Sequence, residues 1–136
     1  MNIPELIHKA IAAREFAYAP YSNFCVGAAL LTKSGKIYTG CNVENAGYSA
    51  TNCAERTALF KAVSEGVREF DAIAIVGSKV GETNTLVTGP CGVCRQALYE
   101  FGGPELTVIM ARSEADYIVT TLGDLLPYGF GPANLE

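Results

Sequence analysis

The sequence predicts an α/β protein, a three-layer α/β/α sandwich built around a mixed sheet of roughly five strands. Two observations lead to this prediction. Segments with helical and strand patterns follow one another in the order α, β, β, α, β, α, β, with one weaker strand after them. A tight-turn signal joins the first two strands into an antiparallel hairpin, whereas helical crossovers favour parallel neighbours later in the sheet.

The N-terminal third of the chain predicts a helix followed by the hairpin. Apolar residues at three-and-four spacing from Ile3 to Tyr18 indicate one buried helix face. Residues 24–31 and 37–41 are small and apolar, and Gly35 lies between them. Because a tight turn needs a residue that accepts positive φ, we expect these two segments to pair.

A polar loop and a second helix follow the hairpin. Residues 42–52 are rich in Asn, Gly and Ser, a composition typical of loops that carry function. Residues 53–65 indicate a helix, with Asn52 as its N-cap and Gly66 as its stop. The continuous apolar run 72–76 then predicts a strand covered on both faces.

The second half of the chain repeats the alternation of strand and helix. Residues 78–89 are polar, contain two Gly and predict a surface loop. Pro90 suits the first turn of a helix over residues 91–101, because proline has no N–H to leave unpaired. The remaining expected elements are strands at 106–110 and 117–121 and a short helical turn at 123–126.

Composition limits the classes of function. At 136 residues, with 49% hydrophobic and 18% charged residues, the chain predicts a single domain over residues 1–136. A net charge of −4 and no basic cluster argue against nucleic acid as a partner. No apolar run is long enough for a membrane span, and the N-terminus lacks the pattern of a signal peptide, so we expect no membrane partner and a cytoplasmic location.

Three of the five cysteines form a pattern typical of metal binding. Cys91 and Cys94 are three residues apart in the first turn of a predicted helix, so both sulfurs project to one side, and Cys53 opens the other helix. Helix N-termini stabilise thiolates. Taken alone, Cys-x-x-Cys also fits a redox pair, structural zinc or buried thiols. Cys25 or Cys41 could be a fourth ligand, although each lies in an apolar strand.

An open zinc site is the interpretation that this ligand count favours. Structural zinc usually has four protein ligands, whereas catalytic zinc has three and leaves the fourth position to water. Arg56 and Arg95 follow the ligand segments and could hydrogen-bond the sulfurs, which would tune the metal. The alternative for either arginine is an ordinary solvated position on a helix.

Glu55 is the candidate catalytic residue. It lies two residues after Cys53, beside the expected metal, where a carboxylate could carry protons. The structural alternative places Glu55 third in the helix, reaching back to the backbone of the Asn52 cap. A non-ligand Glu beside the metal, joined to a Pro-Cys-x-x-Cys segment, is typical of zinc deaminases.

The chain resembles the small homotetrameric cytidine deaminases, in the cytidine and deoxycytidylate deaminase superfamily, over nearly its whole length. The matching segments are AYAPYSNF (17–24), GCNVENA (40–46), NCAERT (52–57), PCGVCRQ (90–96) and LLP (125–127). The resemblance implies one Zn²⁺ per chain on Cys53, Cys91 and Cys94, with Glu55 as proton shuttle. The implied reaction is the hydrolysis of cytidine or deoxycytidine to uridine or deoxyuridine and ammonia, in pyrimidine salvage.

The resemblance also implies a set of nucleoside contacts. Asn42 and Glu44 would hold the ribose hydroxyls, and Phe24 would pack beside the nucleoside. A neighbouring subunit of a homotetramer would contribute some contacts, with Phe130 stacking on the pyrimidine. The full implied set of substrate-binding residues is Phe24, Asn42, Val43, Glu44, Ala46, Tyr48, Ala54 and Phe130. Without the resemblance, Glu44 would be interpreted as a solvated loop carboxylate and Phe130 as cover for a core edge.

Other functions remain as alternatives at this point. A deaminase of the same fold could act on another aminopyrimidine nucleoside, such as blasticidin S, or on a polynucleotide. A zinc module that binds a protein partner is an alternative of a different class. The loop at 78–89 is longer than is usual in the family, so the resemblance predicts the metal site but not the rim of the pocket.

Overall fold

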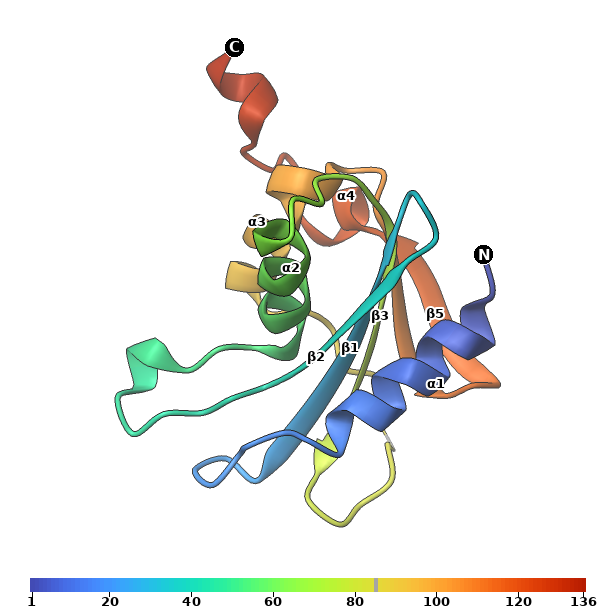
Figure 1. The fold of residues 1–136 in the computed structure, drawn as a ribbon, viewed down its shortest axis with the longest axis vertical. Helices are drawn as coiled ribbons and strands as arrows, with labels where there is room; N and C mark the ends of the chain where they lie inside the picture. The colour runs from blue at the N-terminus through green and yellow to red at the C-terminus, as the bar shows by residue number, and fades with distance from the viewer. Residues whose placement is uncertain (85) are drawn as a thin grey trace.

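A computed structural model of the protein describes residues 1–84 and 86–136. The described helices are α1 (Ile3–Arg14), α2 (Ala54–Ser64), α3 (Gly92–Gly102), α4 (Leu122–Leu125) and the 3₁₀ turns η1 (Tyr48–Ala50) and η2 (Pro132–Leu135). The described strands are β1 (Phe24–Thr32), β2 (Ile37–Cys41), β3 (Phe70–Lys79), β4 (Thr107–Ser113) and β5 (Asp116–Thr121). The α/β/α sandwich and its five-stranded mixed sheet are confirmed (Figure 1).

The strand order is β2-β1-β3-β4-β5. Only the β3 and β4 pair is parallel, and the other three pairs are antiparallel. The crossover through α2 leads from β2 to β3, but β1 lies between these two strands. The expectation that each helical crossover gives parallel neighbours therefore holds for α3 and is wrong for α2.

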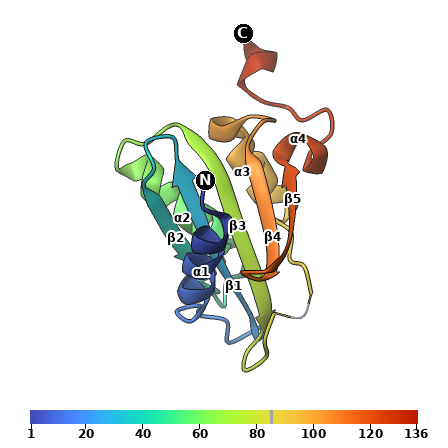
Figure 2. The same cartoon turned by 90° about the vertical axis from the view of Figure 1, so that its right-hand side faces the viewer.

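The two faces of the sheet carry different layers. Helix α1 covers one face, while α2, α3 and α4 cover the other (Figures 1 and 2). Successive residues of a strand point to opposite faces, so Ala28 and Leu30 of β1 pack toward α2, whereas Ala29 packs toward α1. Burial on both faces explains why β3 is an almost continuous apolar run.

The first helix is shorter than the apolar pattern predicts. Helix α1 ends at Arg14, and Glu15 is its C-cap. Tyr18 instead forms an isolated bridge with Val43, and its N–H donates to the carbonyl of Asn42 at 3.0 Å. The segment that follows α1 is thus fastened to the polar loop after β2.

Strand β3 is longer than predicted, because it pairs with β1 along its whole length. Phe24 pairs with Lys79, and Thr32 pairs with Phe70. The predicted loop at 78–89 therefore begins two residues too early. Position 85 of that loop lies outside the described residues.

Helix α2 begins and ends one residue inside the predicted range 53–65, and its N-cap also differs from the prediction. Cys53, not Asn52, is the N-cap, and the Asn52 amide donates to the hydroxyl of Thr57 at 3.2 Å. Glu55 is then the second helical residue, so the predicted alternative of a capping interaction with Asn52 is wrong. Gly66 has φ +94° directly after the helix, as expected of a stop.

The start of α3 also lies one residue later than predicted. Cys91 is the N-cap and Gly92 the first helical residue, so Pro90 precedes the helix. In the hairpin, Gly35 has the expected positive φ of +95°.

Helix α2 lies directly on β2 at Gly40. A Cβ atom on this glycine would lie 2.5 Å from the carbonyl oxygen of Ala54 and 2.6 Å from the amide nitrogen of Ala58. Such distances are far inside van der Waals contact, so only glycine allows the first turns of α2 to approach the sheet this closely.

Among the residues that the structure describes, the helices are all too short or too polar to cross a bilayer.

Candidate metal centre and active site

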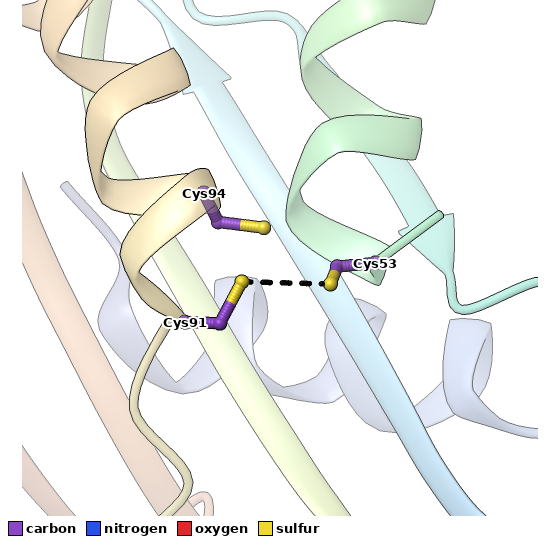
Figure 3. Close-up of side chains that lie close together, drawn as sticks. All are labelled: Cys53, Cys91 and Cys94. Atoms are coloured by element: carbon purple, nitrogen blue, oxygen red, sulfur yellow. Dashed lines mark hydrogen bonds between the residues drawn. The ribbon is translucent and has the colours of Figure 1, made fainter. Parts of the chain in front are cut away.

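Three cysteine sulfurs converge between the first turns of two helices. Cys53 is the N-cap of α2, Cys91 is the N-cap of α3, and Cys94 lies in the first turn of α3. The three Sγ atoms lie within 4.8 Å of one another, and those of Cys53 and Cys91 are 3.7 Å apart (Figure 3). Segments 38 residues apart in the sequence thus meet at one point.

The spacing of the sulfurs fits zinc. Zn–S bonds of about 2.3 Å at tetrahedral angles separate two sulfur ligands by roughly 3.8 Å. Thiolates are soft ligands, and three of them leave one tetrahedral position open. Cys25 and Cys41 belong to β1 and β2 and are not in the described sulfur cluster, which therefore has three members.

Hydrogen bonds favour negative charge at the sulfur cluster. The hydrogen bond from Cys94 lowers the pKa of Cys53 to about 5, with a further hydrogen bond from Arg56. The same contact with Cys53, together with burial, raises the pKa of Cys94. The contact between these two sulfurs favours the thiolate form of Cys53 and the thiol form of Cys94, and binding of a divalent cation would displace the remaining proton.

The two predicted arginines have different partners. Nη2 of Arg56 donates to Sγ of Cys53 at 3.3 Å, as the sequence interpretation expects. Arg95 instead donates through Nε to the carbonyl of Pro90 at 2.7 Å and through Nη1 to that of Leu125 at 2.6 Å. Among the described residues Arg95 forms no hydrogen bond with a sulfur, and its contact with Leu125 ties α3 to α4.

Glu55 lies next to the sulfurs with almost no exposure to solvent. Its exposed fraction is 3%, and it is the second residue of α2. Burial raises the pKa of the carboxyl to about 7, and the nearby Cys53 adds to this effect. A carboxyl group with a pKa near neutrality can both accept and return a proton.

Cys53, Cys91 and Glu55 line a pocket of about 330 Å³, whereas Cys94 is fully buried and does not line it. Of the residues predicted from the sequence, those lining it are Phe24, Asn42, Glu44, Cys53, Ala54, Glu55 and Cys91. A larger hollow of about 500 Å³ lies along β2 and α1 and contains none of the predicted residues. Because chemistry needs titratable groups and a ligand site together, the smaller pocket is the candidate active site.

Two polar side chains on the pocket wall are held in place by backbone groups. The Asn42 amide donates to the carbonyl of Phe24 at 2.8 Å and accepts from the N–H of Val26 at 2.9 Å. Glu44 accepts from the N–H of Tyr21 at 2.9 Å, and from both the N–H and the hydroxyl of Ser22. The hydroxyl contact, the largest influence, lowers the pKa of Glu44.

Four predicted substrate residues do not line this pocket. Val43, Ala46, Tyr48 and Phe130 are all exposed. Tyr48 packs edge-on against Tyr21, with ring centroids 6.1 Å apart. Phe130 lies in the C-terminal tail, which extends beyond the body of the domain in Figure 1.

The sequence interpretation missed part of the pocket wall. Thr88 and Gly89, at the end of the long loop, line the pocket beside Phe24 and Cys91. The hydroxyl of Thr88 donates to the carbonyl of Gly77 at 3.3 Å, which fastens the returning loop to β3. Their position just before Pro90 and Cys91 is the signal that could have identified them.

A family model links this geometry to known proteins. The model described as "Cytidine and deoxycytidylate deaminase zinc-binding region" matches residues 2–110, which include all three cysteines and Glu55.

Individual proteins are similar over nearly the full chain. The cytidine deaminase of Sporosarcina psychrophila is 49% identical over 136 residues, covering 100% of this chain and 96% of that protein. The cytidine deaminase of Halalkalibacterium halodurans is 50% identical over 130 residues, covering 96% and 95%.

Solved structures are also similar to this fold. A cytidine deaminase from Burkholderia pseudomallei has a TM-score of 0.83 and 55% identity, over 93% of this chain and 97% of that one. A cytidine deaminase from Mycobacterium tuberculosis has a TM-score of 0.80 and 42% identity, over 93% and 95%.

Proposed function

The chain belongs to the cytidine and deoxycytidylate deaminase family, and on that premise we propose that it deaminates cytidine and deoxycytidine in pyrimidine salvage. The reaction adds water at C4 of the cytosine ring and releases ammonia, giving uridine or deoxyuridine. A new C4–O bond forms, and the bond from C4 to the exocyclic nitrogen breaks. Residues 1–136 act as one deaminase domain.

One observation carries the proposal. Three cysteine sulfurs converge, and two of these cysteines, Cys53 and Cys91, line a pocket of about 330 Å³ together with the buried Glu55. Packing alone does not explain either group, because burying an ionisable carboxyl beside clustered thiols costs free energy. Groups buried at such a cost are typical of functional sites.

Zinc is the metal that this site holds, with one ion per chain on Cys53, Cys91 and Cys94. When bound, zinc supplies a Lewis acid that lowers the pKa of water from near 15.7 toward neutrality. The Arg56 guanidinium, 3.3 Å from a ligand sulfur, offsets the negative charge of three thiolates.

Glu55 moves the protons of the reaction. Its carboxylate takes one proton from the attacking water and delivers it to ring N3, which makes C4 more electrophilic. The carboxylate then takes the proton of the new C4 hydroxyl group and passes it to the exocyclic nitrogen, so that ammonia leaves and the C4 carbonyl forms. General acid and base steps of this kind contribute about 10²–10⁴-fold to a rate.

Two subunits together hold the nucleoside in this proposal. Phe24, Asn42, Glu44 and Ala54 come from the pocket's own chain, with Val43 at its edge. Ala46, Tyr48 and Phe130 come from neighbouring subunits of a homotetramer. All three side chains are exposed and none lines the pocket of its own chain, which supports this assignment.

The cytoplasm is the proposed place of action. A site of three thiols works only while those thiols stay reduced, and the cytosol maintains that state.

Purified protein tests the reaction and the metal together. We expect ammonia release from cytidine and a zinc content near one per chain. Cys91→Ala loses zinc and activity, whereas Cys25→Ala, a change outside the sulfur cluster, keeps both. If the protein deaminates blasticidin S but not cytidine, the proposed substrate is wrong. If Mg²⁺ but not Zn²⁺ reactivates metal-stripped protein, the three-thiolate site is refuted.

Mixing subunits tests the shared site. Glu55→Ala and Phe130→Ala are unfolded and refolded together, so that an intact Glu55 and an intact Phe130 meet in one pocket. Activity above that of either variant alone is expected. If mass measurement shows mixed oligomers and activity stays low, Phe130 serves its own chain.

A further inference from the structure

The C-terminal tail has an ordered backbone, although the Phe130 side chain is 57% exposed. Before Phe130, the N–H of Gly129 donates to the carbonyl of Leu126 at 3.1 Å. After it, the N–H of Gly131 donates to the side chain of Asn134 at 2.8 Å, and the N–H of Asn134 donates back to Gly131 at 3.0 Å. Local hydrogen bonds therefore flank an exposed aromatic ring on both sides.

Helix α3 holds this segment at two points. Nε2 of Gln96 donates to the carbonyl of Phe130 at 2.8 Å. Three residues later, Tyr99 is half-buried and packs against the core cluster shared by α2 and α3. Residues three apart lie on the same helix face, so Gln96 and Tyr99 form one surface, which we call the tail platform.

The glycines on either side of Phe130 fit closely around the Tyr99 ring. A Cβ on Gly131 would lie 2.6 Å from Cε1 and 2.7 Å from Cδ1 of that ring. A Cβ on Gly129 would lie 2.9 Å from Cε2, on the opposite edge. The backbone therefore straddles the tyrosine, with Phe130 at the crossing point, and neither glycine has room for a side chain.

We infer that Gln96 and Tyr99 are positioning residues that fix the Phe130 backbone and so present its ring to the nucleoside in a neighbouring subunit's pocket. This inference rests on the proposed shared site. Fixing the segment before the substrate arrives removes an entropic cost of binding, which would otherwise fall on each substrate that enters.

The same helix thereby serves two sites. Its first turn provides Cys91 and Cys94 to the metal centre of its own chain, while Gln96 and Tyr99 hold the ring that completes another pocket. Loss of the platform should consequently weaken substrate binding and leave the metal in place.

A double-mutant cycle with Phe130 tests the inference in the purified holoenzyme. Tyr99→Ala removes the platform ring, Tyr99→Phe retains it, and Gly131→Ala pushes the tail away from an intact ring. Tyr117→Ala is the matched control, because Tyr117 is half-buried but packs on the α1 face. Each variant is measured for KM, kcat, zinc content and melting temperature, both with Phe130 and in a Phe130→Ala background.

We expect Tyr99→Ala and Gly131→Ala each to raise KM for cytidine by about 2- to 10-fold, which is the cost of ordering one side chain on binding. Zinc content stays at one per chain, and Tyr99→Phe and Tyr117→Ala keep the original KM. In the Phe130→Ala background, neither Tyr99→Ala nor Gly131→Ala raises KM further, because the ring that the tail platform positions is gone.

Three results overturn the inference, and they are distinguishable. If Phe130→Ala itself leaves KM unchanged, the proposed shared site is wrong, and so is the positioning role of the tail platform. If Phe130→Ala raises KM but neither Tyr99→Ala nor Gly131→Ala does, the shared site is supported and the positioning role of the tail platform is refuted. If Tyr99→Ala and Gly131→Ala raise KM equally in both backgrounds, Tyr99 supports the fold and does not act through Phe130.

Discussion

Glu44 and Glu55 line the same pocket, yet their surroundings give the two carboxyl groups opposite properties. Glu44 is partly exposed and accepts hydrogen bonds from Tyr21 and Ser22, which lower its pKa. Glu55 is 3% exposed, and burial raises its pKa to about 7.

The difference shows how one residue type can have two functions. Three donors point at Glu44, so it remains a charged and immobile acceptor, suited to holding the hydroxyl groups of a sugar. Glu55 has a low-dielectric environment next to the sulfurs and can change its protonation state within a reaction cycle. Separating these roles experimentally means changing each carboxyl group and its supporting residue in turn.

The largest effect is expected from Glu55→Gln. Glutamine has nearly the same shape but cannot carry protons, so kcat falls by at least about 10²–10⁴-fold. Zinc content and the melting temperature stay close to those of the original protein. Glu65→Gln, at the other end of α2, is the matched control and keeps full activity. An active Glu55→Gln protein would remove Glu55 from the mechanism.

The next effect concerns Arg56, the cation that contacts the sulfur cluster. Arg56→Gln loses the hydrogen bond to Cys53 and leaves the thiolate charge uncompensated. We expect zinc affinity to fall by about 10–100-fold, measured by competition with a chelator. Arg68→Gln is the control, because in the described part of the chain Arg68 donates hydrogen bonds to the carbonyls of Val63 and Val67, outside the sulfur cluster. Equal zinc affinity in both variants contradicts the role of Arg56.

A smaller effect is expected from Glu44→Gln. The amide keeps one acceptor but loses the charge that strengthens a hydrogen bond to a ribose hydroxyl. KM for cytidine should rise by about 10-fold, while kcat stays within about 2-fold and zinc is retained. If kcat falls and KM does not, Glu44 takes part in the chemistry, and the contrast between the two glutamates is wrong.

The smallest effect is expected from Ser22→Ala and depends on pH. The Ser22 hydroxyl lowers the pKa of Glu44, so its removal raises that pKa toward the ordinary value. Because a lowered pKa keeps the carboxylate charged until the pH falls through it, the variant loses that charge earlier on acidification. KM should match the original protein near pH 7.5 and exceed it by up to about 2-fold near pH 4.5, where a carboxyl group with its ordinary pKa is half protonated. A constant ratio across this range contradicts the prediction.

Local patterns predicted most elements of the fold, and pairing partners explain the exceptions. The helical pattern continues to Tyr18, but a bridge to Val43 and a bond to Asn42 end α1 at Arg14. The two ends of β3 were missed because its length follows that of β1, including the pair Phe24 and Lys79. A residue's own neighbours in the sequence carry no information on such distant contacts.

The metal centre was more predictable than the wall of the pocket. Cys-x-x-Cys on one helix and Cys-Ala-Glu on another are short, specific patterns, and the structure brings the three sulfurs together. Arg95 was assigned to a sulfur from its sequence position, but its guanidinium contacts Pro90 and Leu125. Thr88 reaches the pocket only because a long loop folds back to Gly77, which no local pattern indicates.

The geometry of the metal centre also depends on Gly40, a residue that is not a metal ligand. The carbonyl of Ala54, one residue after a sulfur ligand, would lie 2.5 Å from any Cβ at this position. Even one methyl group would push the start of α2 away from β2 and so displace Cys53 from its place in the sulfur cluster. In a library of random variants selected for growth on cytidine, Gly40 should therefore be depleted of substitutions as strongly as the ligands. Evolutionary constraint at this site extends to a residue with no side chain.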